Sequence, residues 1–347
     1  MRLGSSDVTP SPSALARRPV CCNHAGLLSR PGPAQPAREL AIIKRILLLV
    51  ILLAILGLAV FWVITIPTTL AADDLPDHTP DVENGAYLFL AGGCSSCHAA
   101  PGAKDEEKLV LSGGLALSTP FGKFHVPNIS PDPNHGIGDW TLADFVSSMK
   151  YGVGRGGEHL YPAFPYTSYQ RMSVEDIIDL KAYLDTLPPS ANNPPPHELP
   201  FPFNIRRGLG LWQLFYVDGR TFQSRSDMSE ELNRGAYLVG GPGHCGECHS
   251  PRNFIGGTEQ NRAYSGGPAP EGEGRIPNIT SDPETGLGDW SEEEIVELLT
   301  TGFTPEFDSV GGSMAQVVRN TAQLTVEDRT AIAAFLKELP PIRSAGN

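Results

Sequence analysis

Two short cysteine motifs are the residues of this sequence best suited to carry out chemistry. The pattern Cys-x-x-Cys-His occupies residues 94–98 and occurs again at residues 245–249. This spacing is the attachment signature of c-type haem, because two thiols add to the vinyl groups of the ring while the adjacent imidazole reaches the iron. The sequence therefore predicts two covalently attached haem c groups. The predicted attachment and iron-binding residues are Cys94, Cys97, His98, Cys245, Cys248 and His249.

Two other kinds of site could use the cysteines of these motifs. A redox dithiol uses the Cys-x-x-Cys spacing but does not require the histidine that follows it. Half of a zinc site would need further cysteine or histidine ligands at short spacing. Because the complete five-residue motif occurs twice, at residues 94–98 and 245–249, we favour haem over both alternatives.

Methionines downstream of each motif are candidates for the ligand on the opposite face of the iron. A thioether in this position stabilises ferrous haem and occupies the site that oxygen or peroxide would need. Met314 lies in a loop before the last predicted helix, and we expect it to bind the second haem. For the first haem we expect Met172 as the ligand, with His159 and Met149 as the alternatives.

An internal repeat surrounds the motifs. Four blocks recur in the same order at an offset of 150 or 151 residues: Gly-Ala-Tyr-Leu, the cysteine motif, Pro-Asn-Ile-Ser/Thr, and Gly-x-Gly-Asp-Trp. The last block ends at Trp140 in the first copy and at Trp290 in the second. We expect both indoles at the haems, either packed against the ring or donating a hydrogen bond to a propionate.

The repeated units carry helical patterns and few strand patterns. Helices are predicted after Thr141, Ser173, Ser291 and Thr325, because each of these residues is followed three positions later by an acidic residue. We therefore predict an all-α fold with tandem modules at residues 73–190 and 228–343. A Pro-rich linker with a basic-aromatic helix joins them at residues 191–227, and this helix is either a strut between the modules or a membrane-interfacial or partner-docking helix.

One uncharged apolar run approaches membrane length. It covers residues 46–66 and would span about 30 Å as a helix. Basic residues precede the run and acidic residues follow it, so the positive-inside rule leaves the N-terminus in the cytoplasm. We expect a single transmembrane anchor after a disordered cytoplasmic tail at residues 1–45. A cleaved signal peptide is the alternative.

The charge is unevenly distributed along the chain. The sequence has 39 acidic and 26 basic residues, a net charge of −13, and residues 1–45 alone carry +5. The remainder therefore carries −18. Such an acidic exported part argues against nucleic-acid binding and favours a partner with a basic surface.

The chain resembles the membrane-anchored multihaem c-type cytochromes that serve as electron-transfer subunits of periplasmic alcohol, sugar-acid and aldehyde dehydrogenases. The resemblance covers about residues 73–343 and implies two tandem class I-like cytochrome c domains. It departs at two points: many relatives have three haem motifs, and Phe164 stands where we expected methionine. Besides the haem motifs and the Trp blocks, it rests on Leu-Tyr-Pro-Ala-Phe-Pro-Tyr at 160–166, Phe-Asn-Ile-Arg-Arg at 203–207 and Gly-Gly-Ser-Met-Ala-Gln-Val-Val at 311–318.

The resemblance implies an electron-transfer protein rather than an enzyme. It would sit in the bacterial inner membrane with its haem domains in the periplasm. A periplasmic dehydrogenase would donate electrons, and a terminal oxidase or another cytochrome would accept them. The protein could be a dedicated subunit of one dehydrogenase or a general carrier. A haem enzyme, either a peroxidase or a small sulfur-compound oxidoreductase, is the remaining alternative, and it would need one open iron.

Overall fold

The computed structural model describes residues 36–272 and 274–344, and this described chain divides into two units between Leu58 and Ala59. Helix α1 (Pro36–Ile64) begins ten residues before the predicted apolar span and ends two residues short of its expected end. Proline at the first helical position and the good helix formers that follow it explain the early start. The rest of the predicted tail lies outside the described residues. Within the described chain, α1 is the one helix long and apolar enough to cross a membrane, and its side chains between residues 38 and 58 are exposed.

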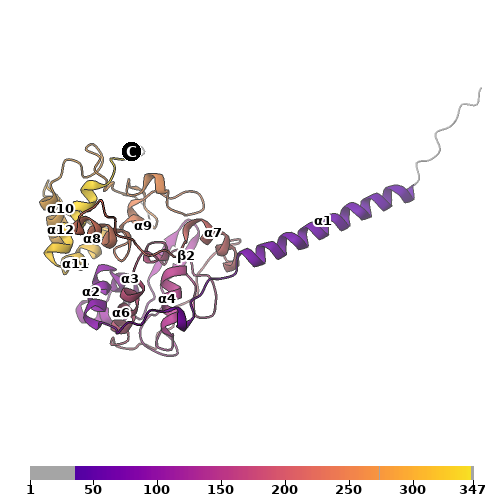
Figure 1. Ribbon diagram of the computed structural model, residues 1–347, viewed down its shortest axis with the longest axis horizontal. Coiled ribbons are helices and arrows are strands. Elements are labelled where there is room, and N and C mark those ends of the chain that lie inside the picture. Colours follow the sequence, from indigo (N-terminus) through magenta and orange to yellow (C-terminus); the bar gives the residue numbers. More distant parts are fainter. Residues whose placement is uncertain (1–35, 273, 345–347) are drawn as a thin grey trace, which may run out of the picture. The chain divides into compact units, whose positions relative to one another are not determined.

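The second unit contains the same order of helices and strands twice (Figure 1). The short η1 (Ala72–Asp74) precedes the first copy. The first copy comprises α2 (Val82–Ala91), α3 (Cys94–His98), η2 (Asp105–Leu109), β1 (Ala116–Thr119), β2 (Gly122–His125), α4 (Leu142–Tyr151), α5 (Tyr166–Tyr169) and α6 (Val174–Leu184). The second comprises α8 (Glu230–Gly240), α9 (Cys245–His249), η4 (Gln260–Arg262), β3 (Gly267–Pro268), β4 (Arg275–Ile276), α10 (Glu292–Thr301), α11 (Gly312–Thr321) and α12 (Val326–Glu338). The sequence repeat is therefore also a structural repeat.

Each repeat also contains a small antiparallel strand pair, which corrects the prediction of a purely helical fold. β1 pairs with β2, and β3 pairs with β4. Glu198 then adds to the edge of β2, where its backbone exchanges hydrogen bonds of 3.0 and 2.9 Å with Lys123. These strands are two to four residues long, too short for an alternating apolar pattern to reveal them.

Glycines allow the first and last helices of each repeat to cross closely. A Cβ atom on Gly85 of α2 would lie 2.0 Å from the carbonyl oxygen of Asp179 on α6. A Cβ atom on Gly235 of α8 would lie 1.9 Å from the carbonyl oxygen of Ala331 on α12. No side chain fits at these distances, so the Gly-Ala-Tyr-Leu block is a helix-crossing motif. Each crossing closes one hydrophobic core, the first including Leu88, Val146 and Ile177, the second Leu238, Ile295 and Ala333.

Two of the four predicted helix starts form complete capping boxes. Thr141 Oγ1 accepts the Asp144 backbone N–H at 3.1 Å, and the Asp144 carboxylate accepts the Thr141 N–H at 2.9 Å. Ser291 and Glu294 make the same pair of bonds at the start of α10. Reciprocal bonds of this kind satisfy two backbone donors at the helix start, and they confirm the predicted beginnings of α4 and α10.

The capping boxes predicted at Ser173 and Thr325 are only half formed. Thr325 Oγ1 accepts a hydrogen bond from the Asp328 backbone N–H at 3.1 Å, but the Asp328 carboxylate does not accept one from the Thr325 backbone N–H. That N–H is instead bound by the hydroxyl of Tyr87 from the other repeat, at 3.2 Å. Tyr237 binds the Ser173 N–H in the same way at 3.3 Å. A tyrosine from the opposite repeat thus takes the place that the acidic side chain fills in an ordinary capping box.

The segment between the repeats is fixed to both of them. Beyond the extended stretch around Glu198 come η3 (Arg206–Gly208) and α7 (Leu209–Tyr216), which form the predicted basic-aromatic helix. Gln213 Nε2 donates to the carbonyl of Gly152 in the first repeat at 3.2 Å. Trp212 Nε1 donates to the carbonyl of Ile255 in the second repeat at 3.1 Å. Helix α7 therefore contacts both repeats, as the strut interpretation expects.

Candidate haem-binding sites

The four motif cysteines lie on the short helices α3 and α9. All four are free thiols, so neither motif forms a disulfide. Burial raises the pKa of Cys94 to about 12 and that of Cys97 to about 11. Burial likewise raises the pKa of Cys245 to about 12. A redox dithiol needs a thiol of lowered pKa, so the raised pKa values favour attachment of a cofactor over dithiol exchange. The described residues contain no cluster of three or more His, Cys, Asp or Glu side chains suited to a metal ion.

Both motif histidines are oriented by the same backbone contact. His98 Nδ1 lies 3.0 Å from the carbonyl oxygen of Pro127, and His249 Nδ1 lies 2.9 Å from that of Pro277. A carbonyl can only accept, so Nδ1 carries the proton and the Nε2 lone pair is left to bind iron. Burial lowers the pKa of His98 to about 4 and also lowers that of His249, which keeps both rings neutral. These features fit the proximal ligand of a c-type haem.

Trp140 and Trp290 hold equivalent positions in the two repeats. Each is partly buried against the core of its own repeat. Their backbone N–H groups donate to the carbonyls of Ile137 and Leu287, both at 3.1 Å. Within the described chain, neither indole N–H donates to a protein acceptor. Both indoles are thus placed against a core with a free donor, which is compatible with either role predicted for them.

Two tyrosines near the cysteines were not identified from the sequence. Burial and then the neighbouring Cys94 raise the pKa of Tyr169, and burial and then Cys245 raise that of Tyr264. Neither hydroxyl donates a hydrogen bond to any other described residue. The two tyrosines do not occupy corresponding positions of the repeat, so comparing the two copies could not have revealed them.

The predicted methionine ligands lie in the same cores as the cysteines. Met172 is only 1 % exposed and belongs to the first core, against which Cys94 also packs. Met314 packs against the second core together with Cys245. Phe164, which corresponds to Met314 in the repeat, is partly buried against the first core. Met172 and Met314 thus each lie in or against a core that a motif cysteine also contacts, and Met149 belongs to the first core as well.

The alternative ligands for the first haem have other roles in the structure. His159 Nδ1 lies 2.6 Å from Gln213 Oε1, and its Nε2 lies 2.9 Å from the carbonyl oxygen of Thr65. With both ring nitrogens bound to protein groups, His159 has no lone pair available for iron. Met149 is buried in α4, and the corresponding residue of the second repeat is the buried Leu299. The second repeat therefore has an aliphatic core residue at the position that Met149 occupies in the first repeat.

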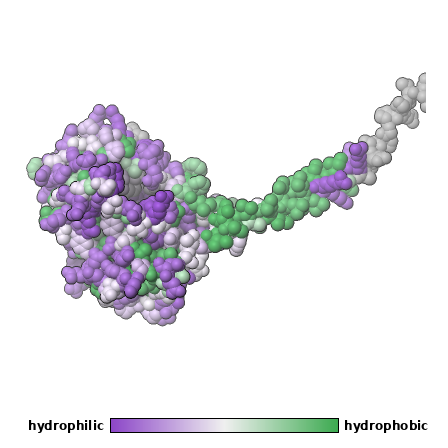
Figure 2. Space-filling model, viewed as in Figure 1, coloured by the Kyte–Doolittle hydropathy of each residue, from purple (hydrophilic) through white to green (hydrophobic). Residues whose placement is uncertain are grey.

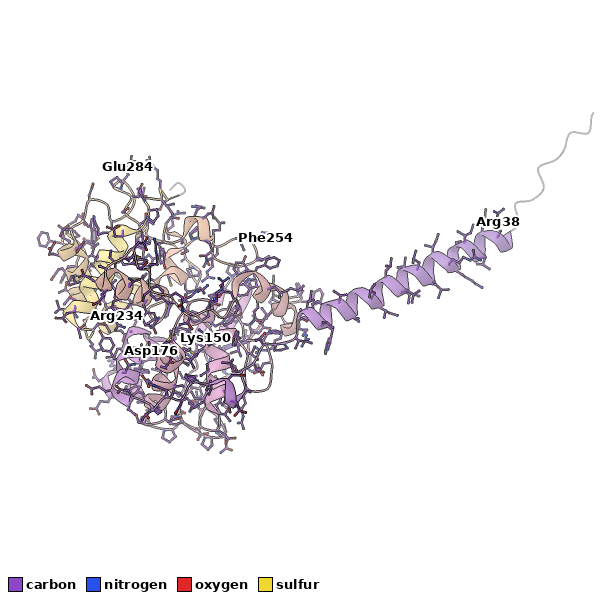
Figure 3. All side chains as sticks on the ribbon, in the orientation of Figure 1. Arg38, Lys150, Asp176, Arg234, Phe254 and Glu284 are labelled. Atoms are coloured by element: carbon purple, nitrogen blue, oxygen red, sulfur yellow. The ribbon has the colours of Figure 1, made fainter. Side chains whose placement is uncertain are left out.

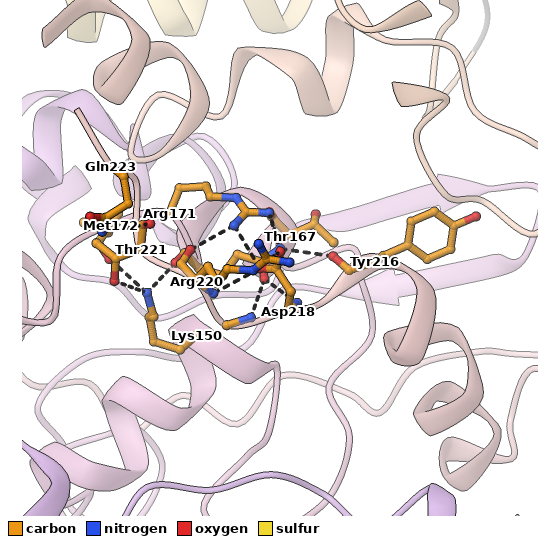
Figure 4. A network of polar contacts seen from close by, with 11 residues as sticks. Lys150, Thr167, Arg171, Met172, Tyr216, Asp218, Arg220, Thr221 and Gln223 are labelled. Atoms are coloured by element: carbon orange, nitrogen blue, oxygen red, sulfur yellow. Dashed lines mark hydrogen bonds and ion pairs between the residues drawn. The ribbon is translucent and has the colours of Figure 1, made fainter. Parts of the chain in front are cut away.

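Lys150 fixes the loop that carries Met172 (Figure 4). Its buried Nζ donates to the carbonyls of Gln170 and Met172, the latter at 3.1 Å, and to Thr221 Oγ1 at 2.9 Å. Burial lowers the pKa of Lys150 to about 8. The backbone of Met172 is thus held in place by a buried ammonium group, which no pattern in the sequence indicated.

The third residue of each haem motif is bound by the opposite repeat. Asn320 of α11 donates to Ser96 Oγ at 2.9 Å. Glu247, the corresponding residue of the second motif, accepts hydrogen bonds from Thr167 and from Ser168, the latter at 3.0 Å. An ion pair of 2.8 Å with Arg252 also holds this carboxylate. Each attachment segment is therefore held by a residue of the opposite repeat.

A further contact joins the segments that precede the two motifs. His244, directly before the second motif, has its Nε2 3.2 Å from the carbonyl oxygen of Gly92, close to the start of the first motif. Its ring packs edge-on against Tyr169 at 5.5 Å between centroids. The pKa of Cys97 is raised by burial, then by Glu271 and by Cys248 of the other motif. The attachment sites are neighbours in one structural unit.

Comparison with known proteins agrees with this geometry. Residues 82–188 match the family model described as "Cytochrome c". The chain is 52 % identical over 291 residues to a "Diheme cytochrome c-type" protein of Cereibacter sphaeroides, covering 84 % of this chain and 96 % of that protein. It is 38 % identical over 272 residues to the "Fructose dehydrogenase cytochrome subunit" of Gluconobacter japonicus, covering 78 % of this chain and 54 % of that subunit.

A third relative comes from another dehydrogenase. It is the "Alcohol dehydrogenase (quinone), cytochrome c subunit" of Gluconobacter oxydans, 36 % identical over 275 residues, with 77 % of this chain and 56 % of that subunit covered. The chain spans just over half the length of these two dehydrogenase subunits. Nearly full coverage of the Cereibacter protein, and two motifs with the same histidine geometry, lead to one conclusion: this chain belongs to the dihaem c-type cytochromes, a family of haem-binding electron-transfer proteins.

Proposed function

We propose that this protein is a membrane-anchored carrier that relays single electrons from a periplasmic dehydrogenase to a terminal oxidase or another cytochrome. The observation that supports the proposal is that each attachment segment is bound by the opposite repeat, the first at Ser96 and the second at Glu247. Haem supplies reversible one-electron chemistry when bound. Two sites held side by side in one unit suit passage of an electron between them.

We propose that each iron has ligands on both faces. His98 and Met172 would bind the first haem iron, and His249 and Met314 the second. The occupied ring nitrogens of His159 support Met172 over histidine in the first site. Six-coordinate iron leaves no position for oxygen or peroxide, and this favours electron transfer over catalysis. We further propose that Trp140 and Trp290 bind the haems.

We propose that α1 is an uncleaved anchor in the bacterial inner membrane. Its apolar length and exposed side chains support this, as do Arg38, Lys44 and Arg45 near its N-terminal end. The acidic residues Asp73 and Asp74 follow the helix. By the positive-inside rule the haem-binding unit would then lie in the periplasm, with modules at residues 73–190 and 228–343.

The names of the relatives support a dehydrogenase as the electron donor. Two of them are cytochrome subunits, of fructose dehydrogenase and of alcohol dehydrogenase. The net charge of −18 after residue 45 would direct this chain to a basic surface on its partner, mainly by speeding the encounter.

A tagged full-length chain purified in mild detergent from its own membranes tests the proposal. We expect a dehydrogenase to co-purify, and its substrate to reduce both haems of this chain. The matched control replaces Cys245 and Cys248 by alanine, which should leave only the first haem reducible. Ready binding of carbon monoxide to one reduced haem of the unmodified protein would instead favour a haem enzyme.

A further inference from the structure

Helix α7 has its apolar side chains on the outside. Leu211, Leu214 and Phe215 are exposed, with Phe215 at 78 %, while Gly210 and Gln213 face inward. A helix on the surface of a water-soluble domain normally turns its apolar face toward the core. The spacing i, i+3, i+4 places the three exposed residues on one face, so this face is suited to contact with an apolar environment.

Neighbouring segments extend the same apolar surface. Phe254 is 93 % exposed on the loop that Trp212 of α7 holds through the Ile255 carbonyl. Figure 2 shows hydrophobic residues gathered on the side of the unit where Figure 1 places α7, and Figure 3 shows Phe254 on that side. Residues 199–217 contain two arginines and no acidic residue, although the chain after residue 45 carries −18. We call this surface the α7 face; its exposed members are Phe201, Phe203, Ile205, Leu211, Leu214, Phe215, Phe254 and Ile255.

The α7 face is continuous with the end of the apolar run. The Arg207 guanidinium lies 4.4 Å from the ring centre of Trp62 and donates to the Trp62 carbonyl at 2.7 Å and to Thr65 Oγ1 at 2.9 Å. A Cβ atom on Gly210 would lie 2.6 Å from the Cβ of Thr65, so the start of α7 packs directly on this segment. If the anchor crosses the bilayer, the chain emerges from the bilayer at Thr65. The start of α7 packs on Thr65 and must then lie at the same depth, at the membrane surface. Tryptophan is typical of this boundary.

We propose that the α7 face is a membrane-binding surface that inserts into the headgroup region of the bilayer beside the anchor. Lipid is the occupant that the contacts favour, because the face adjoins residues 62–65, where the anchor ends. A second attachment to the membrane would hold the haem-binding unit in one orientation. This inference rests on the proposed anchor.

Nitroxide labels on the full-length, haem-loaded chain test the inference in vesicles of phosphatidylethanolamine and phosphatidylglycerol. Cys21 and Cys22 are first replaced by serine, and single labels follow from Phe215→Cys and Phe254→Cys. Phe307→Cys is the matched control, because Phe307 is 91 % exposed on the loop between α10 and α11. We expect the labels at 215 and 254 to lose contact with a water-soluble nickel complex and to gain contact with oxygen, whereas the label at 307 keeps its contact with nickel.

A label introduced by Leu53→Cys separates the two proposals. If this label lies in lipid but those at 215 and 254 are as accessible to nickel as the label at 307, the inference is overturned and the anchor stands. If the label at 53 also contacts nickel, the proposed anchor fails, and the membrane-binding surface fails with it. Protection of 215 and 254 in native membranes but not in pure lipid would assign the face to a protein partner, which also overturns the inference.

Discussion

The hydroxyl of Tyr87 on α2 lies 2.5 Å from the carboxylate of Asp328 on α12, and this contact joins the two repeats. Burial, and then Asp328, raise the pKa of Tyr87. Tyr237 of the second repeat likewise donates to Asp176 of the first. Each repeat therefore contributes one tyrosine that binds a carboxylate of the other repeat. Asp176 is labelled in Figure 3, as is Arg234, which binds Asp328 at 2.7 Å. The repeats are held together by a reciprocal pair of tyrosine–carboxylate bonds.

Removing either tyrosine hydroxyl should therefore weaken the contact between the repeats. We expect Tyr87→Phe and Tyr237→Phe each to lower the free energy of unfolding by about 1–3 kcal/mol, because each leaves a carboxylate with one donor fewer. Thermal unfolding of the haem-loaded protein, followed by far-ultraviolet circular dichroism, measures the loss. Tyr183→Phe is the control, because within the described chain the Tyr183 hydroxyl donates to no protein group. A loss in the control equal to that in either variant would contradict the assignment.

The number of haems tests the two motifs directly. The alkaline pyridine spectrum of the reduced, denatured protein should show two thioether-linked haems per chain. The double replacement Cys245→Ala and Cys248→Ala should leave one haem, and so should the corresponding change at Cys94 and Cys97. Haem that acid acetone extracts from the unmodified chain would show that the cysteines do not attach it.

The ligands opposite the histidines are tested by single substitutions. Met314→Ala and Met172→Ala should each weaken the sulfur-to-iron absorption band of the ferric protein, lower one reduction potential and open one iron to carbon monoxide. Met149→Leu is the control, because Leu299 occupies the corresponding position of the second repeat. His159→Ala should leave the spectrum unchanged. A changed haem spectrum in His159→Ala alone, with Met172→Ala unchanged, would reverse the assignment.

His197 should make stability depend on pH in the acidic range. Burial, then Arg206 and His125, lower the pKa of His197 from 6.5 to about 4, and its Nδ1 accepts the His125 backbone N–H at 3.1 Å. Between these two values the unfolded chain binds a proton that the folded chain does not bind. The contribution of His197 is therefore complete above pH 6.5 and is lost as the pH falls toward 4.

Urea unfolding at several pH values measures this contribution. His197→Asn keeps an acceptor for the backbone N–H but does not titrate, so the stability of the unmodified protein relative to the variant should fall as the pH is lowered from 6.5 to 4. His135→Asn, on an exposed loop, is measured in parallel as the control. A difference between wild type and His197→Asn that stays constant over this range would contradict the proposed role of His197.

Features encoded by neighbouring residues could be predicted from the sequence alone. The haem motifs, the apolar run and the repeated blocks are each contained in a short stretch. The helix starts at Thr141 and Ser291 were predicted correctly, because the capping residue and the acidic residue are three positions apart in one helix turn.

Features that depend on contacts between distant residues were decided by the tertiary structure. Asp328 has the spacing of a capping-box residue, yet its carboxylate binds Tyr87, 241 residues away in sequence. The sequence leaves His159 as a possible iron ligand, but in the structure its two ring nitrogens contact Gln213 Oε1 and the carbonyl oxygen of Thr65. The outward direction of Phe215 likewise follows from where α7 packs. A sequence pattern lists the groups that can form hydrogen bonds, but which partner each group takes depends on which elements the fold brings within reach.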